Sequence, residues 1–290
     1  MAVPFDPHPL LQDYAHPECL VSAAWLSARL GTDGIRVIES DEDSLLYDIG
    51  HIPGAIRINW LKDLNDGSIR DFISGEQFAA LMEEKGISRD DTVIIYGDKA
   101  NSWAAFTFWI FKLFGHEDVR LLNGGRDAWM AEERDTSFSI PEYPATHYPV
   151  VERVDVPLRA FFTDVLEKNN NTVLLDVREE DEYIGKNSTS YPHKGALRQG
   201  HIPSAMNITW DKTILPNTYF RSHENLKEIF QTLDDSMEII TYCQTGERAA
   251  HTWFVLKYLV GIKNVRIYDG SWAEWGNMVR NPIIRGSLPA

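Results

Sequence analysis

The chain has 290 residues, of which 43% are hydrophobic and 24% are charged, and its formal net charge is −15. This length fits two domains of ordinary size, and the apolar content is sufficient for buried cores. The acidic balance argues against non-specific binding to nucleic acid or to anionic membranes. An anionic substrate would therefore have to be held by a local positive field.

The cysteine content and the apolar runs indicate a cytoplasmic protein. The two cysteines, Cys19 and Cys243, fall in different expected domains, so no disulfide framework is predicted and a reducing compartment is indicated. The first residues lack the basic and apolar regions of a signal peptide. The most apolar run, at 103–114, is too short to span a bilayer.

The first half of the chain predicts short helices and strands in alternation. Helices are expected at 21–30, 75–85 and 103–114, and strands at 35–39, 92–96 and 119–122. A turn followed by a strand is expected at 51–60, a loop at 98–101, and a glycine-rich turn at 123–129.

The second half repeats this order. Helices are expected at 158–167 and 249–260, and strands at 173–178, 238–242 and 265–268. The segment 201–210 repeats the His-Ile-Pro-x-Ala pattern and the final tryptophan of segment 51–60, which indicates a duplication. Strands that alternate with helices predict an α/β fold with two tandem domains, each a mainly parallel sheet flanked by helices on both faces.

The domain boundaries follow from this repeat. We expect a first domain at 18–135, a proline-rich linker at 136–157 and a second domain at 158–285. The second domain carries a polar insertion at 185–200 that the first domain lacks, and it lies between Arg178 and His201, where it could cover the rim of a site.

The strand at 238–242 ends at Cys243, which a short loop joins to an apolar helix. The amides of residues 244–248 and the N-terminus of that helix can present partial positive charge to the sulfur. Both effects favour the thiolate, which is the nucleophilic form. The sequence therefore predicts a nucleophilic cysteine at this point.

Several motifs together resemble the tandem-domain rhodanese family, which comprises thiosulfate and 3-mercaptopyruvate sulfurtransferases. They are the duplicated His-Ile-Pro segment, the strand end Asp176-Val177-Arg178, the Cys-x-x-Gly loop and the closing Asp269-Gly270-Ser271-Trp272. The resemblance extends from about residue 20 to about residue 280. It implies an inactive first domain and a persulfide on Cys243 of the second. The implied activity moves the sulfane sulfur of thiosulfate to cyanide or a thiol in two steps, with no cofactor.

The repeat supports an inactive first domain. Counting back from Lys112 and Lys257 in the two apolar helices places Asp98 opposite Cys243. An aspartate cannot attack a sulfane sulfur, so the first domain is expected to serve as a scaffold.

The expected site combines the loop with two arginines, because a guanidinium matches an oxyanion by bidentate hydrogen bonding. The alternative for Arg178 is a structural pairing with Asp176 or Glu182. Glu247 is more simply explained as an acid at the first turn of a helix than as a catalytic group. The residues expected to bind substrate are Arg178, Gln244, Thr245, Gly246, Glu247 and Arg248, and those expected to support the site are Asp176, His201, Asp269, Gly270 and Trp272.

Charge favours thiosulfate as the donor. Gln244 and Thr245 stand where the animal thiosulfate enzymes have basic residues, and the Gly-Glu-Arg sequence that follows resembles the bacterial type. Mercaptopyruvate enzymes have a second arginine where this chain has Glu182, which would repel a carboxylate. 3-Mercaptopyruvate sulfurtransfer is the alternative.

Two further classes of function remain as alternatives. A cysteine phosphatase needs His-Cys-x5-Arg, whereas here Tyr242 precedes the cysteine and Arg248 lies one residue too close. A persulfide carrier or regulatory module would form the persulfide but turn over small donors poorly. His51 and His201 occupy matching turns and are expected to stabilise them, and no Cys/His cluster has metal-ligand spacing. We expect a monomer.

Overall fold

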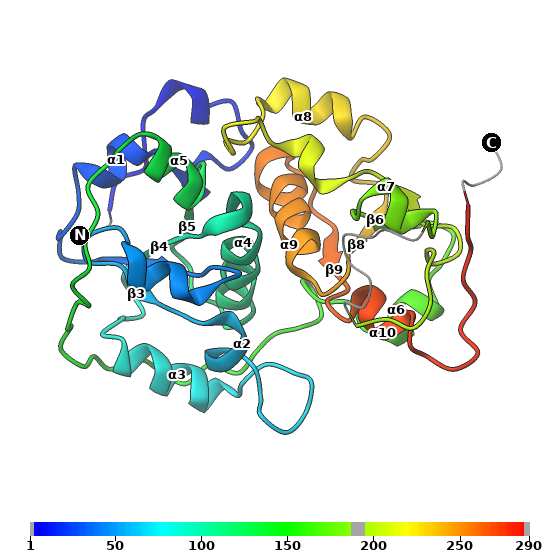
Figure 1. Ribbon diagram of the computed structural model, residues 1–290, viewed down its shortest axis with the longest axis horizontal. Coiled ribbons are helices and arrows are strands. Elements are labelled where there is room, and N and C mark those ends of the chain that lie inside the picture. The colour runs from blue at the N-terminus through cyan, green and yellow to red at the C-terminus, as the bar shows by residue number, and fades with distance from the viewer. Residues whose placement is uncertain (1–2, 187–194, 287–290) are drawn as a thin grey trace. The chain divides into compact units, whose positions relative to one another are not determined.

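The computed structural model describes residues 3–186 and 195–286 of the chain (Figure 1). Contacts between Cα atoms divide the chain into two compact units. Unit 1 comprises Met1–Val154 and Ile214–Ser222, and unit 2 comprises Asp155–Thr213 and His223–Ala290. A short segment from the second half of the sequence therefore belongs to the first unit.

Unit 1 contains one parallel sheet with the strand order β1-β5-β4-β2-β3. The predicted strands at 35–39, 92–96 and 119–122 are all present with those bounds. The strands are β1 (Leu20–Val21), β2 (Ile35–Glu39), β3 (Ile56–Arg57), β4 (Thr92–Tyr96) and β5 (Val119–Leu122).

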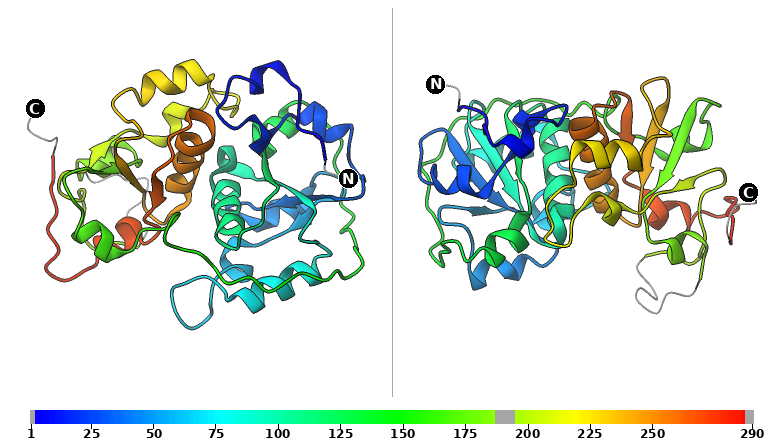
Figure 2. Two further views of the ribbon diagram at one scale, coloured as in Figure 1. Left: turned by 180° about the vertical axis from the view of Figure 1, so that it is seen from behind. Right: turned by 90° about the horizontal axis from the view of Figure 1, so that it is seen from above.

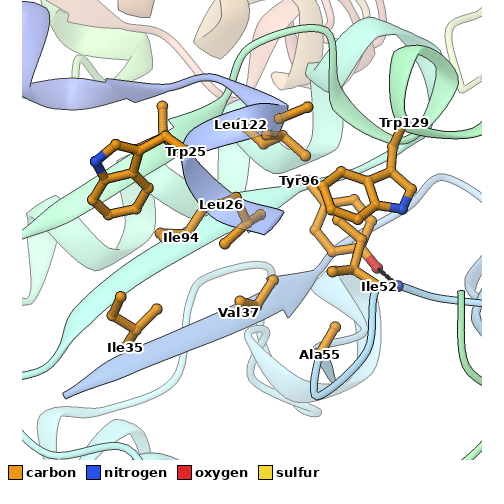
Figure 3. Packing of buried hydrophobic residues seen from close by; sticks show 12 residues of the cluster. Trp25, Leu26, Ile35, Val37, Ile52, Ala55, Ile94, Tyr96, Leu122 and Trp129 are labelled. Atoms are coloured by element: carbon orange, nitrogen blue, oxygen red, sulfur yellow. Dashed lines mark hydrogen bonds between the residues drawn. The ribbon is translucent and has the colours of Figure 1, made fainter. Parts of the chain in front are cut away.

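Helices cover both faces of this sheet. Figure 3 shows Trp25 and Trp129 packed with Ile94 and Tyr96 on one face, where α1 and α5 lie. On the other face α4 packs against β4 and β5. The helical segments of unit 1 are η1 (Pro9–Leu11), η2 (Pro17–Cys19), α1 (Ala23–Ser27), η3 (Ser44–Ile49), α2 (Trp60–Asp63), α3 (Gly75–Glu84), α4 (Asp98–Leu113) and α5 (Gly125–Ala131).

The start of α4 is irregular. Lys99, Ala100 and Asn101 have φ values of 48°, 52° and 66°, so the right-handed helix runs only from Ser102 onward. This agrees with the loop predicted at 98–101. Three successive non-glycine residues in the left-handed region are strained, and tertiary contacts must hold them there.

Unit 2 repeats the arrangement with the strand order β7-β6-β8-β9, again all parallel. Arg159 pairs in parallel with Ile267 and so takes the place that β1 has in unit 1. The helix predicted at 158–167 is therefore wrong at its start. It begins only at Phe162, where the carboxylate of Asp164 accepts the N–H of Phe161. The strands are β6 (Thr172–Asp176), β7 (Met206–Asn207), β8 (Glu238–Tyr242) and β9 (Val265–Ile267).

The sheet of unit 2 is also covered on both faces. A cluster that includes Val165, Tyr242 and Trp272 lies on the face of α6 and α10. The orange helix α9 runs along β8 and β9 (Figure 2). The helical segments are α6 (Phe162–Leu166), α7 (Glu180–Tyr183), η4 (Trp210–Thr213), α8 (His223–Ile229), α9 (Glu247–Phe254), the π-helical η5 (Val255–Val260) and α10 (Ser271–Trp275).

These two sheets confirm the predicted fold class. Each unit is an α/β layer structure in which parallel strands lie between helices. Among the described residues, no helix combines the length and apolarity needed to cross a membrane.

Candidate functional site

Cys243 follows β8 directly and is completely buried. Its N–H donates to the hydroxyl of Ser271 at 3.1 Å, and its carbonyl accepts the N–H of Trp272 at 3.1 Å. These bonds fix the cysteine against the first turn of α10. Ser271 was not among the predicted support residues, although it lies within the Asp-Gly-Ser-Trp motif that the sequence analysis noted.

The loop after Cys243 turns one backbone amide toward the sulfur. Gly246 caps α9 with a φ of 112°, a left-handed conformation that favours glycine. Its N–H donates to Cys243 Sγ at 3.1 Å, and a backbone hydrogen bond from Ala249 also reaches the thiol. The glycine of the Cys-x-x-Gly motif is thus required by backbone geometry. Ala249, one residue beyond the predicted loop, was missed.

Burial opposes the effect of the loop amides on the Cys243 thiol. Burial, followed by the negative charge of Glu247, raises the pKa of the thiol to about 11. Arg248 and the amides of Ala249 and Gly246 lower this pKa but do not outweigh the first two effects. The loop amides favour the thiolate, as the sequence indicates, but they act on a sulfur that has lost all contact with water. The balance of these effects favours the thiol over the thiolate at neutral pH.

The carboxylate of Glu247 lies next to this thiol. Its Oε2 is 3.6 Å from Cys243 Sγ and accepts a hydrogen bond from Thr245 Oγ1 at 2.6 Å. Its Oε1 is 3.4 Å from Nε of Arg248. Both oxygens are thus held in place, one of them within hydrogen-bond reach of the sulfur.

Arg248 forms a two-point ion pair with Glu182. Its two terminal nitrogens lie 2.7 and 3.3 Å from the carboxylate oxygens of Glu182. Burial opposes ionisation of Glu182, but the bonds from Arg248 hold the pKa of this carboxyl below its ordinary value. Glu182 is therefore neutralised by Arg248, which weakens the argument that it repels a carboxylate substrate.

Arg178 lies in a different environment from Arg248. Only 1% of its surface is exposed, and it donates to both oxygens of Asp176 and to the carbonyl of Gly200 at 2.8 Å. Its guanidinium also stacks on the ring of Trp272, 4.7 Å from the centroid. These contacts favour the alternative in which Arg178 is a structural partner of Asp176.

The other predicted residues surround the loop in different ways. The carbonyl of Gln244 accepts the N–H of Ala273 at 3.0 Å, while Thr245 is exposed. Asp269 forms an ion pair with Arg159 at 2.8 Å, a partner that the sequence analysis did not identify.

The remaining support residues are held by backbone contacts. His201 Nδ1 bonds to the carbonyl of Tyr183 at 2.7 Å, as His51 does to that of Tyr47 at 2.9 Å. A side chain at Gly270 would collide with the carboxylate of Glu274.

The predicted insertion at 185–200 is described only in part, since residues 187–194 lie outside the described residues. Trp272 Nε1 donates to the carbonyl of Arg198 at 2.9 Å. The Arg198 side chain donates to the carbonyls of Trp275 and Gly276, each at 2.9 Å. The described end of the insertion therefore packs on α10, the helix that fixes Cys243.

In unit 1, Gly97 rather than Asp98 occupies the position of Cys243. Tyr96 and Tyr242 pair with equivalent residues of β2 and β6, and each hydroxyl accepts the amide of the isoleucine in the His-Ile-Pro turn. The next residue in each copy accepts an N–H from the first turn of the closing helix. The count from the lysines was off by one, because the first copy has one residue more between its tyrosine and its lysine.

The loop amides of unit 1 are already occupied by side chains. The N–H of Asp98 donates to Asp41 at 2.7 Å, that of Ala100 to Asp127 at 3.1 Å, and that of Gly97 to the Asn101 side chain at 3.0 Å. Asp41 also stands at the position of Arg178, two residues after the strand. This loop has a glycine in the position of the cysteine, and three of its amides are bonded to side chains instead of being open to an anion.

We therefore expect that Gly97→Cys will not create a second sulfur-accepting site. A Cβ at this position would collide with the carbonyl oxygen of Ser40, and the amides that could bind an anion have internal partners. Mass spectrometry of Gly97→Cys in a Cys243→Ser background, after incubation with thiosulfate, should show no added sulfur. A sulfur adduct on residue 97 would contradict this account of the inactive copy.

Within the described ranges, no group of three or more histidine, cysteine, aspartate or glutamate side chains is arranged to hold a metal ion. The groups next to the sulfur are the carboxylate of Glu247 and the paired guanidinium of Arg248.

The sequence is similar to those of known proteins. A sequence model of the rhodanese-like domain matches twice, at residues 22–132 and 162–278. A thiosulfate sulfurtransferase from Corynebacterium glutamicum is 61% identical over 291 aligned residues, which cover 99% of this chain and 97% of the relative.

Two other similar proteins extend the comparison. A protein of Thermus thermophilus named sulfur carrier protein TtuD is 50% identical, with 94% of this chain and 99% of the relative covered. The crystal structure of YnjE superposes with a TM-score of 0.82 at 27% identity and covers 95% of this chain and 70% of that protein.

Proposed function

Since the chain belongs to the rhodanese-like family, with two copies of its domain, we propose that it is a thiosulfate sulfurtransferase that works through a persulfide on Cys243. The observation that carries the proposal is the sulfur of Cys243 at the carboxyl end of β8, with the N–H of Gly246 directed at it from 3.1 Å. The relative that is 61% identical over the whole chain and named for this activity supports the same donor.

In the first half-reaction, Cys243 Sγ bonds to the outer sulfur of thiosulfate. The sulfur–sulfur bond of thiosulfate breaks, and its electron pair leaves with sulfite. The amide of Gly246 stabilises negative charge on the bound sulfur, as donors aimed at a developing anion do. In the second half-reaction, cyanide or a thiol attacks the outer sulfur of the persulfide and regenerates Cys243.

The roles of the remaining residues follow from their contacts. Arg248 supplies the positive charge near the sulfur, while Arg178 holds Trp272 and the strand end through Asp176. Gln244 and Thr245 line the loop, and Asp269, Gly270 and His201 support it. We further propose the domain limits 18–135 and 158–285, a monomeric state and a cytoplasmic location.

A comparison of two donors tests the proposal. We expect thiocyanate production from cyanide with thiosulfate, and a lower kcat/KM with 3-mercaptopyruvate, because the relative that is 61% identical over the whole chain is named for thiosulfate. Mass spectrometry after thiosulfate alone should show one added sulfur on Cys243. A kcat/KM at least about tenfold higher with 3-mercaptopyruvate, equivalent to about 1.4 kcal/mol, would show instead that the protein is a 3-mercaptopyruvate sulfurtransferase.

A second candidate function is that of a sulfur carrier, which the 50% identical relative named as one favours. A carrier would form the persulfide with thiosulfate but release it slowly to cyanide. Steady-state thiocyanate formation no faster than in Cys243→Ala, together with a stable persulfide, would establish the carrier function instead.

A further inference from the structure

We infer that Glu247 is a catalytic residue that removes the thiol proton of Cys243 during persulfide formation. This inference rests on the proposed sulfurtransferase function. It differs from the simpler interpretation of Glu247 as an acid that stabilises the first turn of α9, which predicts no contact with the nucleophile.

The carboxylate of Glu247 lies in contact with the sulfur of Cys243. Oε2 of Glu247 lies 3.6 Å from Cys243 Sγ, within the range of a hydrogen bond from a thiol. Sγ also accepts the N–H of Gly246 at 3.1 Å. The sulfur can therefore donate its proton to Glu247 while it accepts from the loop.

Two neighbours hold the carboxylate of Glu247 and orient it. Thr245 Oγ1 donates to Oε2 at 2.6 Å, and Nε of Arg248 lies 3.4 Å from Oε1. Arg248 is itself fixed by two bonds to Glu182 of α7. A first-turn acid that acts only on the helix dipole needs neither of these contacts. Thr245, Arg248 and Glu182 are thus positioning residues.

The thiol of Cys243 needs a base in order to act as a nucleophile. Burial and the adjacent carboxylate raise the pKa of Cys243 to about 11, so the resting enzyme holds a thiol. A thiol is a poor nucleophile, and a base in contact with it is required for attack at neutral pH. Of the groups that contact Sγ in the described part of the chain, the N–H groups of Gly246 and Ala249 and the carboxylate of Glu247, only the carboxylate can accept a proton.

Persulfide formation from thiosulfate transfers one sulfur atom and one proton. The bond between Cys243 Sγ and the outer sulfur of thiosulfate forms, and the sulfur–sulfur bond of thiosulfate breaks with its electron pair on sulfite. The thiol proton passes to Glu247 and then to sulfite, which leaves as hydrogensulfite. An anionic persulfide remains on Cys243. When a thiol accepts the sulfur, its own proton returns through Glu247 to Cys243.

Glu247→Gln separates this role from a purely electrostatic one, because the two predict opposite changes. Loss of the charge lowers the pKa of Cys243, since Glu247 raises it in the wild type. If Glu247 acted only through its charge, the variant would form more thiolate and react faster at neutral pH. If it removes the proton, persulfide formation slows by about 100-fold or more, the usual contribution of a general base.

The experiment measures single-turnover persulfide formation from thiosulfate in a Cys19→Ala background. The pH dependence of the rate constant is compared with a thiolate titration by ultraviolet absorbance. The titratable groups around the Glu247–Arg248 pair include Glu179 and Glu182 at α7, and Asp211 of η4 acts on Glu179. His251, a titratable side chain, lies one turn along α9. The matched control is Glu180→Gln, which removes an exposed carboxylate of α7.

We expect Glu247→Gln to combine a lower thiol pKa with slow persulfide formation at neutral pH, and a rate that rises about tenfold per pH unit while the thiolate is limiting. Glu247→Asp should form the persulfide at an intermediate rate, because it keeps a carboxylate but at a greater distance from Cys243 Sγ. A rate in Glu247→Gln equal to or above that of Glu180→Gln would overturn the inference. Absence of persulfide in the wild type would instead overturn the proposed function.

Discussion

Replacement of Cys243 by serine is expected to reduce thiosulfate-dependent thiocyanate formation to the uncatalysed background, a loss on the order of 10⁶-fold. A serine oxygen cannot take up a sulfane sulfur to form a persulfide, so the covalent intermediate is lost. The hydroxyl can still accept the N–H of Gly246 and donate to Glu247, so the loop should keep its conformation. The measurement is the steady-state rate, with intact-protein mass after incubation with thiosulfate.

The matched control for this variant is Cys19→Ala. Cys19 is also buried, and burial raises the pKa of its thiol to about 12, but it belongs to unit 1. We expect full activity and one added sulfur in Cys19→Ala, and neither in Cys243→Ser. Persistent sulfur uptake by Cys243→Ser would mean that a group other than this cysteine receives the sulfur, and the site would have to be sought elsewhere.

Much of the fold can be predicted from the sequence because its strands are short, apolar and separated by strong turn signals. β2, β4, β5 and β8 have the predicted bounds. The start of α6 could not be predicted from apolar spacing, because Arg159 pairs with Ile267, a contact across more than one hundred residues. Local periodicity cannot detect such pairing.

The position of Cys243 between a strand and a helix was predictable from the sequence, whereas its burial and side-chain partners were not. The pKa of Cys243 depends on complete burial, which follows from the packing of α10 over the loop. The Arg248–Glu182 pair joins residues from separate elements and is invisible in the order of the sequence. For the same reason the sequence indicates a helix-terminal acid at Glu247, whereas in the structure its Oε2 lies 3.6 Å from Cys243 Sγ.

Arg178 illustrates how burial changes the role expected from a residue type. The sequence suggested an anion ligand, while the structure places its guanidinium between Asp176, Gly200 and the ring of Trp272. Burial alone would lower the pKa of Arg178, but the carboxylate of Asp176 holds it above its ordinary value. Asp176 and Arg178 therefore form a buried ion pair, in which each side chain compensates the charge of the other.

Asp176→Asn is accordingly expected to destabilise unit 2 by about 3–5 kcal/mol, the usual effect of leaving a buried charge unpaired. Asp176 is completely buried and accepts both the backbone N–H and the guanidinium of Arg178. Asparagine has almost the same shape but no charge. The loss of stability therefore arises from the unpaired charge of Arg178 rather than from a cavity. Because Trp272 stacks on Arg178, its fluorescence should report the loss.

The free energy of unfolding is best measured by urea titration, with the transition of each unit fitted separately because a chain with two units need not unfold in one step. The control is Asp181→Asn, which breaks the Lys186–Asp181 pair, whose side chains are 67% and 57% exposed. Such a surface pair should contribute less than about 1 kcal/mol. The double variant Asp176→Leu, Arg178→Met removes both charges and should regain most of the lost stability. If Asp176→Asn cost no more than Asp181→Asn, the charge of Arg178 could not depend on Asp176, and Arg178 would again be a candidate ligand for the anionic donor.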